Sequence, residues 1–168
     1  MEVFFHIAAI PFWSKLANFH GLLAMLSLIL FGSAIVLFFL SDKFVLVIKW
    51  LKISLTALFV NLALLDIAGL VIYTEYRAPG GPRSILKSLT ETSWLHDIVF
   101  EHKEFLAFAP PVLIFCAAFI VLSLGNSFQD QVKFRWLRTT VITSIILSLI
   151  FVLVVAGEAV LVAKVAPL

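Results

Sequence analysis

The sequence predicts an all-α integral membrane protein, a four-helix bundle with an amphipathic helix in its long second loop. The chain is 62% hydrophobic, and its mean hydropathy is +1.13. Only 13% of its residues are charged, whereas a soluble domain carries about 25%. Four apolar stretches each reach the length of about 20 residues that an α-helix needs to cross a hydrocarbon core. The 168 residues therefore form one transmembrane domain with no separate soluble module.

The apolar stretches are the predicted spans, in chain order His20–Leu40, Ile53–Thr74, Phe105–Leu124 and Thr139–Ala163. The segment before the first span, Met1–Phe19, has Glu2 where a signal peptide would be basic. Its aromatic residues predict an interfacial segment that lies on the membrane surface. The pair Pro110-Pro111 predicts a break or kink early in the third span.

The second loop has an organisation of its own. Its first part, Arg77–Arg83, contains two glycines and two prolines, which end helices and set turns. From Ser84 onward, apolar residues recur at helical spacing with polar residues between them. This pattern predicts a short amphipathic helix over the end of the bundle, either as a lid or as a docking surface for a partner subunit.

The charges in the loops predict the orientation. The first and third loops each carry three basic residues and one acid, a net charge of +2 each, from Asp42, Lys43, Lys49, Lys52, Asp130, Lys133, Arg135 and Arg138. The second loop is nearly balanced. The positive-inside rule then places loops one and three in the cytoplasm and both termini outside the cell membrane. Because the basic residues are scattered over the helix ends, they predict no nucleic-acid partner.

Two histidines are the candidate metal ligands. His20 opens the first span and His102 precedes the third, and both spans run in the same direction. The two imidazoles are therefore expected at a similar outer depth, as the two axial ligands of a haem b require. The alternative is a pair of interfacial histidines that bond to loops or lipid headgroups.

Two carboxylates are expected deeper in the bundle, at the same end. Asp66 lies about 12 Å and Glu158 about 7–8 Å below the ends of their spans, at 1.5 Å per residue. A carboxylate at such depth is protonated or paired and faces the bundle interior or water. It could take up protons beside a quinol, ligate a metal, or orient one of the histidines. The alternative is a structural hydrogen bond between spans two and four.

Tyr73 belongs to a polar patch that closes the second span. Tyr73 and Arg77 are four residues apart and share a helix face. They are consistent with an aromatic belt and a snorkelling arginine. They also fit a quinone headgroup pocket, in which Tyr73 would donate to a carbonyl oxygen.

Two segments carry a resemblance to known proteins. The run His102-Lys-Glu-Phe-Leu-Ala-Phe-Ala-Pro-Pro and the segment Gly69–Arg77 resemble small four-helix membrane subunits of prokaryotic, especially archaeal, respiratory chains. These subunits include b-type cytochrome-like proteins and proteins associated with haem–copper oxidases. The resemblance implies a subunit of a terminal oxidase or quinol-oxidising complex. Unlike b-type cytochromes, this chain has no histidine within spans two and four.

Three functions therefore remain open from the sequence. The first is a respiratory electron-transfer subunit with a haem b or quinone site at the outer face, held by His20, His102, Asp66, Glu158 and Tyr73. The second is a structural or assembly subunit without a cofactor. The third is a small proton or metal-ion conduit. No HExxH, P-loop or GxSxG motif is present. The sequence thus favours an accessory subunit among other membrane subunits over an enzyme that acts alone.

Overall fold

The computed structural model describes residues 11–166, and every regular element in this part of the chain is helical. Three of the long rods are single helices: α2 (Phe12–Leu40), α3 (Val45–Tyr76) and α8 (Arg135–Val165). The remaining rod is composite and consists of α4 (Pro82–Ser88), α5 (Thr90–Trp94), the π-helix η1 (Leu95–Phe100), α6 (Glu101–Ala107), α7 (Ala109–Leu124) and the 3-10 turn η2 (Gly125–Gln129).

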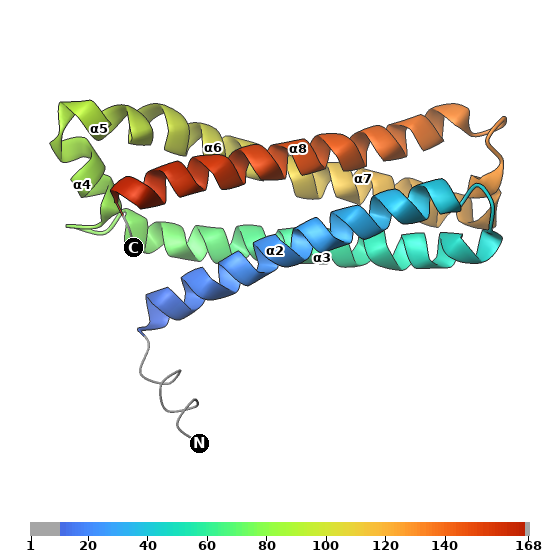
Figure 1. The fold of residues 1–168 in the computed structure, drawn as a ribbon, viewed down its shortest axis with the longest axis horizontal. Coiled ribbons are helices and arrows are strands. Elements are labelled where there is room, and N and C mark those ends of the chain that lie inside the picture. The colour runs from blue at the N-terminus through green and yellow to red at the C-terminus, as the bar shows by residue number, and fades with distance from the viewer. Residues whose placement is uncertain (1–10, 167–168) are drawn as a thin grey trace, which may run out of the picture.

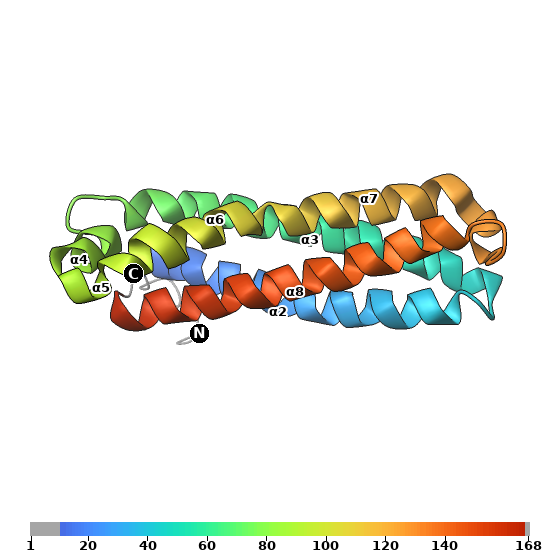
Figure 2. The ribbon, with the colours of Figure 1, turned by 90° about the horizontal axis from the view of Figure 1, so that it is seen from above.

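The four rods lie side by side and alternate in direction (Figures 1 and 2). Helix α2 packs along α3, α3 along α7, and α7 along α8, whereas contacts between α2 and α8 are sparse. Toward its N-terminus α2 diverges from α8 (Figure 1). We call the end that carries residues 77–100 the lid end, and the end that carries residues 41–44 and 125–134 the basic end.

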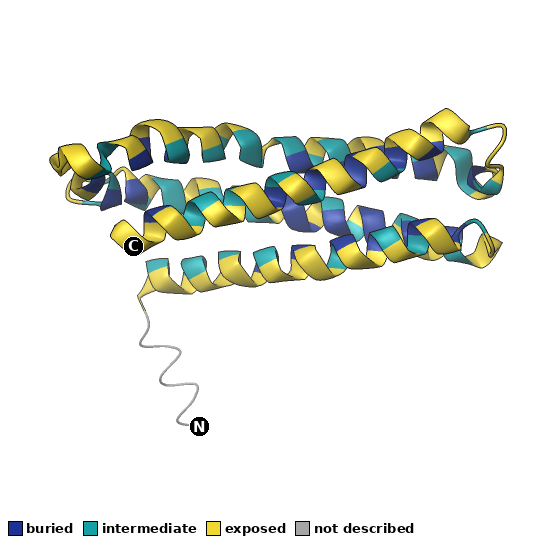
Figure 3. Ribbon diagram, turned by 45° about the horizontal axis from the view of Figure 1, so that its top comes forward, coloured by how far each residue is buried: buried dark blue, intermediate teal, exposed yellow. Residues whose placement is uncertain are grey.

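The all-α four-helix bundle predicted from the sequence is confirmed. Within residues 11–166, four helical segments are long and apolar enough to cross a membrane. Large apolar side chains are exposed on the rods, including Leu46, Phe105 and Phe119, which are 71%, 82% and 62% exposed. Exposed positions run along the outward faces of the rods (Figure 3). Because water does not tolerate apolar surface on this scale, these faces contact lipid, and the chain is a multi-pass membrane protein.

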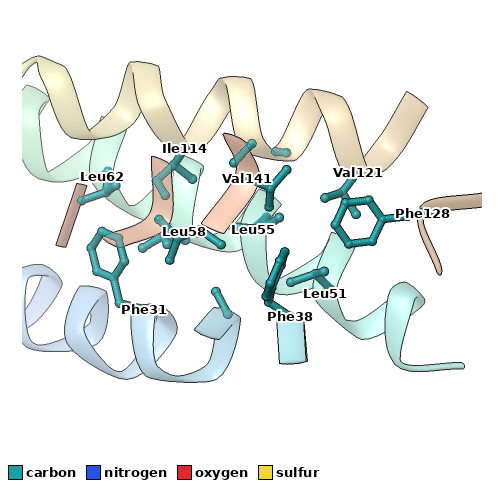
Figure 4. Close-up of a cluster of buried hydrophobic side chains, with 14 of the residues drawn as sticks. Phe31, Phe38, Leu51, Leu55, Leu58, Leu62, Ile114, Val121, Phe128 and Val141 are labelled. Carbon is teal, nitrogen blue, oxygen red and sulfur yellow. The ribbon is translucent and has the colours of Figure 1, made fainter. Parts of the chain in front are cut away.

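The inward faces meet in a dry apolar core over the middle of the bundle and its basic end (Figure 4). Its fully buried members include Phe31, Leu58, Ile114 and Ile145, one from each rod. A second apolar cluster lies at the lid end and consists of Tyr76, Leu86, Leu95, Phe100, Val162 and Ala166.

The spans are longer than hydropathy alone indicated. Helix α2 begins at Phe12, so residues 12–19 continue the first span and do not form a separate segment before it. Residues 1–10, which hold the rest of the predicted interfacial segment, lie outside the described part of the chain. The predicted break at Pro110-Pro111 is present, because α6 ends at Ala107 and α7 begins at Ala109 with proline in its first turn.

The second loop is helical, as predicted, but in three short pieces. Helices α4 and α5 are separated at Leu89, whose backbone is extended, and α5 runs through η1 into α6. Leu86, Leu95 and Phe100 point into the lid-end cluster. Residues 82–100, which we call the lid, therefore pack onto the ends of α3 and α8.

Gly81 fixes the turn between α3 and the lid, and a larger residue has no room there. A Cβ atom at this position would lie 2.6 Å from the Glu75 carbonyl oxygen and 3.0 Å from that of Ala78. We expect Gly81→Ala to destabilise the packed lid by about 1–3 kcal/mol, measured as faster amide hydrogen exchange in residues 82–100. Gly157→Ala is the matched control, because nothing lies within 4 Å of the added methyl group. Equal exchange in the two variants would contradict this expectation.

Asn61 joins α3 to α2 inside the bundle. Its side-chain Nδ2 donates to the Leu23 carbonyl oxygen at 2.9 Å and to Ser27 Oγ at 2.8 Å. We expect Asn61→Leu to lower the free energy of unfolding in detergent by about 1 kcal/mol, the usual size of an interhelical hydrogen bond in membranes. Ser33→Ala removes only an exposed bond within its own helix, so it should change stability little. A similar loss in both variants would show that Asn61 has no interhelical role.

Candidate functional site

A set of polar side chains lies between the two apolar clusters of the bundle. Along α3 it falls between Leu65, which packs on the middle core, and Tyr76 in the lid-end cluster. Along α8 it falls between Val152, a member of the middle core, and Val162, a member of the lid-end cluster. We call this set the polar layer; its members are His20, Asp66, Tyr73, His102, Lys103, Glu104 and Glu158.

His20 faces α3. Its Nδ1 lies 3.1 Å from the Leu65 carbonyl oxygen, and because a carbonyl oxygen only accepts, Nδ1 carries the proton. The ring edge rests over Gly69, where an added Cβ atom would be 3.4 Å from His20 Cε1. The other nitrogen, Nε2, has no hydrogen-bond partner among the described residues and keeps its lone pair.

His102 and Glu158 form the closest polar pair of the layer. His102 Nδ1 lies 2.6 Å from Glu158 Oε1, which joins α6 to α8. The His102 side chain is 57% exposed, whereas that of Glu158 is 17% exposed. Glu158 Oε2 is buried and has no hydrogen-bond partner within the described residues. The structure thus combines an accessible imidazole with a carboxylate held beneath it.

Lys103 is a member that the sequence analysis missed. Its half-buried ammonium group interacts electrostatically with Glu104, Glu158 and His20, and Nζ lies 4.4 Å from the centre of the Phe100 ring. A lysine at a helix end is ordinarily taken for a snorkelling residue. Only the packing of α6 against α8 reveals that this one lies within the layer.

Tyr73 is held by aromatic and charged neighbours. Its hydroxyl interacts with the Glu104 carboxylate, Arg77 Cζ lies 4.5 Å from its ring centre, and its ring stacks at 5.8 Å on Phe100. The predicted pairing with Arg77 is therefore present. Tyr73 lies on the α3 side of the layer, beside Glu104, whereas His102 bonds to α8.

Asp66 is the isolated member. It is half-buried on α3, and no described residue forms a hydrogen bond or ion pair with it. The hydrogen bond considered between spans two and four does not join Asp66 to Glu158, because Glu158 accepts from His102. Asp66 is thus a carboxylate within the layer that no group in residues 11–166 neutralises.

The lid contains a second histidine site that the sequence analysis did not identify. His96 is 1% exposed; Arg83 Nε donates to its Nε2 at 3.2 Å, and its Nδ1 lies 2.9 Å from the Tyr76 hydroxyl. Since arginine only donates, Nε2 is unprotonated and Nδ1–H donates to Tyr76. Both ring nitrogens are occupied by protein groups, so His96 ties the lid to α3 and offers no free atom to a ligand.

The described residues provide no cage for a bare metal ion. Within residues 11–166, no group of three or more His, Cys, Asp or Glu side chains is placed to hold one. His20 and His102 share a feature of iron-ligating histidines. In each ring Nδ1 bonds to an oxygen acceptor, and Nε2 is available to a ligand. The two belong to different helix pairs, His20 to α2–α3 and His102 to α6–α8.

Comparison with known proteins found no matching family, no similar curated protein and no similar solved structure.

Proposed function

We propose that this chain is an integral membrane subunit of a respiratory electron-transfer complex, and that its polar layer binds the headgroup of a quinol near the outer face of the membrane. The observation that carries the proposal is the His102–Glu158 pair, 2.6 Å apart at the exposed side of the layer. The basic loops at the opposite end support this orientation through the positive-inside rule.

The pair has the chemistry of a proton acceptor for a quinol. Because Nδ1–H donates to Glu158, the lone pair of His102 Nε2 is available to accept a quinol hydroxyl proton. The His102 side chain is 57% exposed, so a quinol can reach its ring. The imidazolium formed by this transfer is stabilised by the carboxylate below it. The two electrons leave to the redox centre of a neighbouring subunit.

The remaining members of the layer supply donors and acceptors of the kinds that a quinone headgroup binds. Lys103 supplies a cation, and the Tyr73–Glu104 pair supplies a hydroxyl beside a carboxylate. A ring oxygen of the headgroup would accept from Lys103 or Tyr73, as the carbonyls of quinones do from protein donors. Asp66, which has no hydrogen-bond partner among the described residues, offers a second carboxylate for the released proton.

Haem b is the second candidate cofactor, and the anchored Nδ1 atoms of both histidines favour it. His20 and His102 would hold its iron through Nε2 and give it a redox role in electron transfer. The quinol site is preferred because it needs only the His102–Glu158 pair, whereas a haem needs both histidines to reach it from separate helix pairs.

A conduit through a single chain is disfavoured by the core beneath the layer. Leu58, Ile114 and Ile145 are completely buried there, and no described charged group is part of that cluster. A proton or metal ion that entered the layer would next meet a packed apolar core. The layer is therefore closed on the side of the basic end.

The decisive experiment is purification of the native complex in mild detergent, with absorption spectra of its oxidised and reduced forms and solvent extraction of bound quinone. We expect redox subunits to copurify with the chain and a quinone to be bound. His102→Ala should remove the quinone. Glu91→Ala, which changes an exposed residue of the lid, should retain it. A haem band lost in both His20→Ala and His102→Ala would instead assign haem b. A colourless, quinone-free protein among other membrane subunits would overturn the proposal in favour of the cofactor-free structural subunit.

A further inference from the structure

A second polar site lies at the basic end, far from the polar layer. A pocket of about 280 Å³ opens between the end of α2 and the first turns of α8, and it is lined by residues that include Phe39, Asp42, Gln131, Arg135, Arg138 and Ile142. This volume is slightly below the roughly 300–1,000 Å³ of sites that enclose a whole small molecule. It suits a headgroup whose remainder lies outside the pocket.

One wall of the pocket is rigid. The Arg138 residue is 6% exposed; its guanidinium donates to the Phe128 carbonyl oxygen at 2.6 Å and pairs with the Asp42 carboxylate. The same group packs over the rings of Phe38 and Phe128, at 5.1 and 4.5 Å from their centres. Because the Asp42 charge is neutralised by Arg138, it repels an incoming anion only weakly.

Arg135 gives the pocket a net positive charge. It lies three residues before Arg138 on α8, and this spacing places both side chains on one face of the helix. No described residue pairs with its guanidinium. The pocket thus holds two guanidinium groups and one carboxylate, and Gln131 adds an amide that can donate.

The surroundings of the pocket are those of a membrane–water interface. Trp136 and Val132 beside it are 83% and 93% exposed, and exposed tryptophans at helix ends typically mark the headgroup level. Phe39 is 58% exposed on the neighbouring face of α2, and the apolar side chain of Ile142 lies one turn further along α8. Charged groups therefore face the mouth, and apolar surface leads from it along the bundle.

We propose that this pocket binds an acidic phospholipid, with the phosphate on the Arg135 guanidinium and the Gln131 amide, and with the acyl chains along Phe39 and Ile142. Guanidinium groups are well suited to phosphate because their planar array of donors matches its oxygens. Basic pockets between transmembrane helices are typical binding sites for anionic lipid headgroups. The same phosphate chemistry would admit a free phosphate ion, which lacks the chains that the apolar surface would hold. The proposal is independent of the quinol site.

The test measures lipid retention by native mass spectrometry of the purified full chain, titrated with phosphatidylglycerol and, separately, with phosphatidylcholine. We expect preferential binding of phosphatidylglycerol and an approximately tenfold loss of affinity in Arg135→Gln, the size of one charge-assisted contact. Lys49→Gln is the matched control, because it removes an exposed charge at the same end outside the pocket and should leave binding near the wild-type value. Arg135 is exposed and unpaired, so its replacement does not threaten folding.

Three outcomes would overturn the proposal. Unchanged retention in Arg135→Gln would show that the pocket is not the site. An equal loss in Lys49→Gln would show general attraction to the basic end. Displacement of the lipid by an equimolar amount of inorganic phosphate would show a free-anion site without a contribution from the acyl chains.

Discussion

Glu158→Gln is expected to lower quinol-driven turnover of the parent complex about 100-fold, the lower end of what a general base contributes. The amide preserves the size of the side chain and can still accept from His102 Nδ1–H, but it carries no charge to stabilise the imidazolium that proton transfer creates. The expected loss is in the maximal rate, because the quinol contact on His102 Nε2 remains. Steady-state oxidation of a soluble quinol by the purified complex measures it.

Glu91→Gln is the matched control for this experiment. Glu91 is an exposed carboxylate in the lid at the same end of the bundle, so its replacement removes the same charge outside the polar layer. Turnover in this variant should equal that of the wild type. Wild-type turnover in Glu158→Gln, with assembly of the complex intact, would contradict the proton-acceptor role of the pair.

Arg138→Ala is expected to destabilise the bundle by about 1–3 kcal/mol, the usual consequence of leaving a buried hydrogen-bond partner unsatisfied. The change leaves Asp42 without its cation, leaves the Phe128 carbonyl oxygen unpaired, and opens a cavity between the Phe38 and Phe128 rings. Since these contacts join α2 and η2 to α8, the loss should appear in global unfolding. Unfolding in mixed detergent micelles, followed by circular dichroism, measures it.

Arg135→Ala provides the comparison for Arg138→Ala. It removes the same charge three residues earlier on α8, where the guanidinium is exposed and unpaired, so the change in stability should stay within about 0.5 kcal/mol. If both variants lose stability equally, the effect comes from the charge of the basic end and not from the buried network.

Several features of the polar layer were predictable from the sequence because they depend on depth alone. An apolar run fixes which residues lie near each membrane face, so His20, His102, Asp66 and Glu158 were assigned to one end of the bundle. Depth does not fix the direction in which a side chain points around its helix. That direction decided that Glu158 bonds to His102, and that Asp66 bonds to neither histidine.

Other residues gave little or no signal in the sequence. Lys103 and His96 lie in a polar segment, where such residues are ordinarily solvated, and they are drawn inside by the packing of the lid and α6. The Arg138–Asp42 pair joins residues 96 positions apart. Each was counted in the loop charges, but the count cannot show that the two charges neutralise one another.

By itself, the sequence determined that residues 11–166 contain four membrane-spanning segments, that the third of them breaks near its paired prolines, and which end is basic, because the cost of polar groups in hydrocarbon acts on each segment separately. Only the tertiary structure decided which polar groups meet: His102 with Glu158, His96 with Tyr76 and Arg83, and Arg138 with Asp42. Such pairings depend on the rotation of each helix about its axis, and that rotation is set by side-chain packing among all four rods.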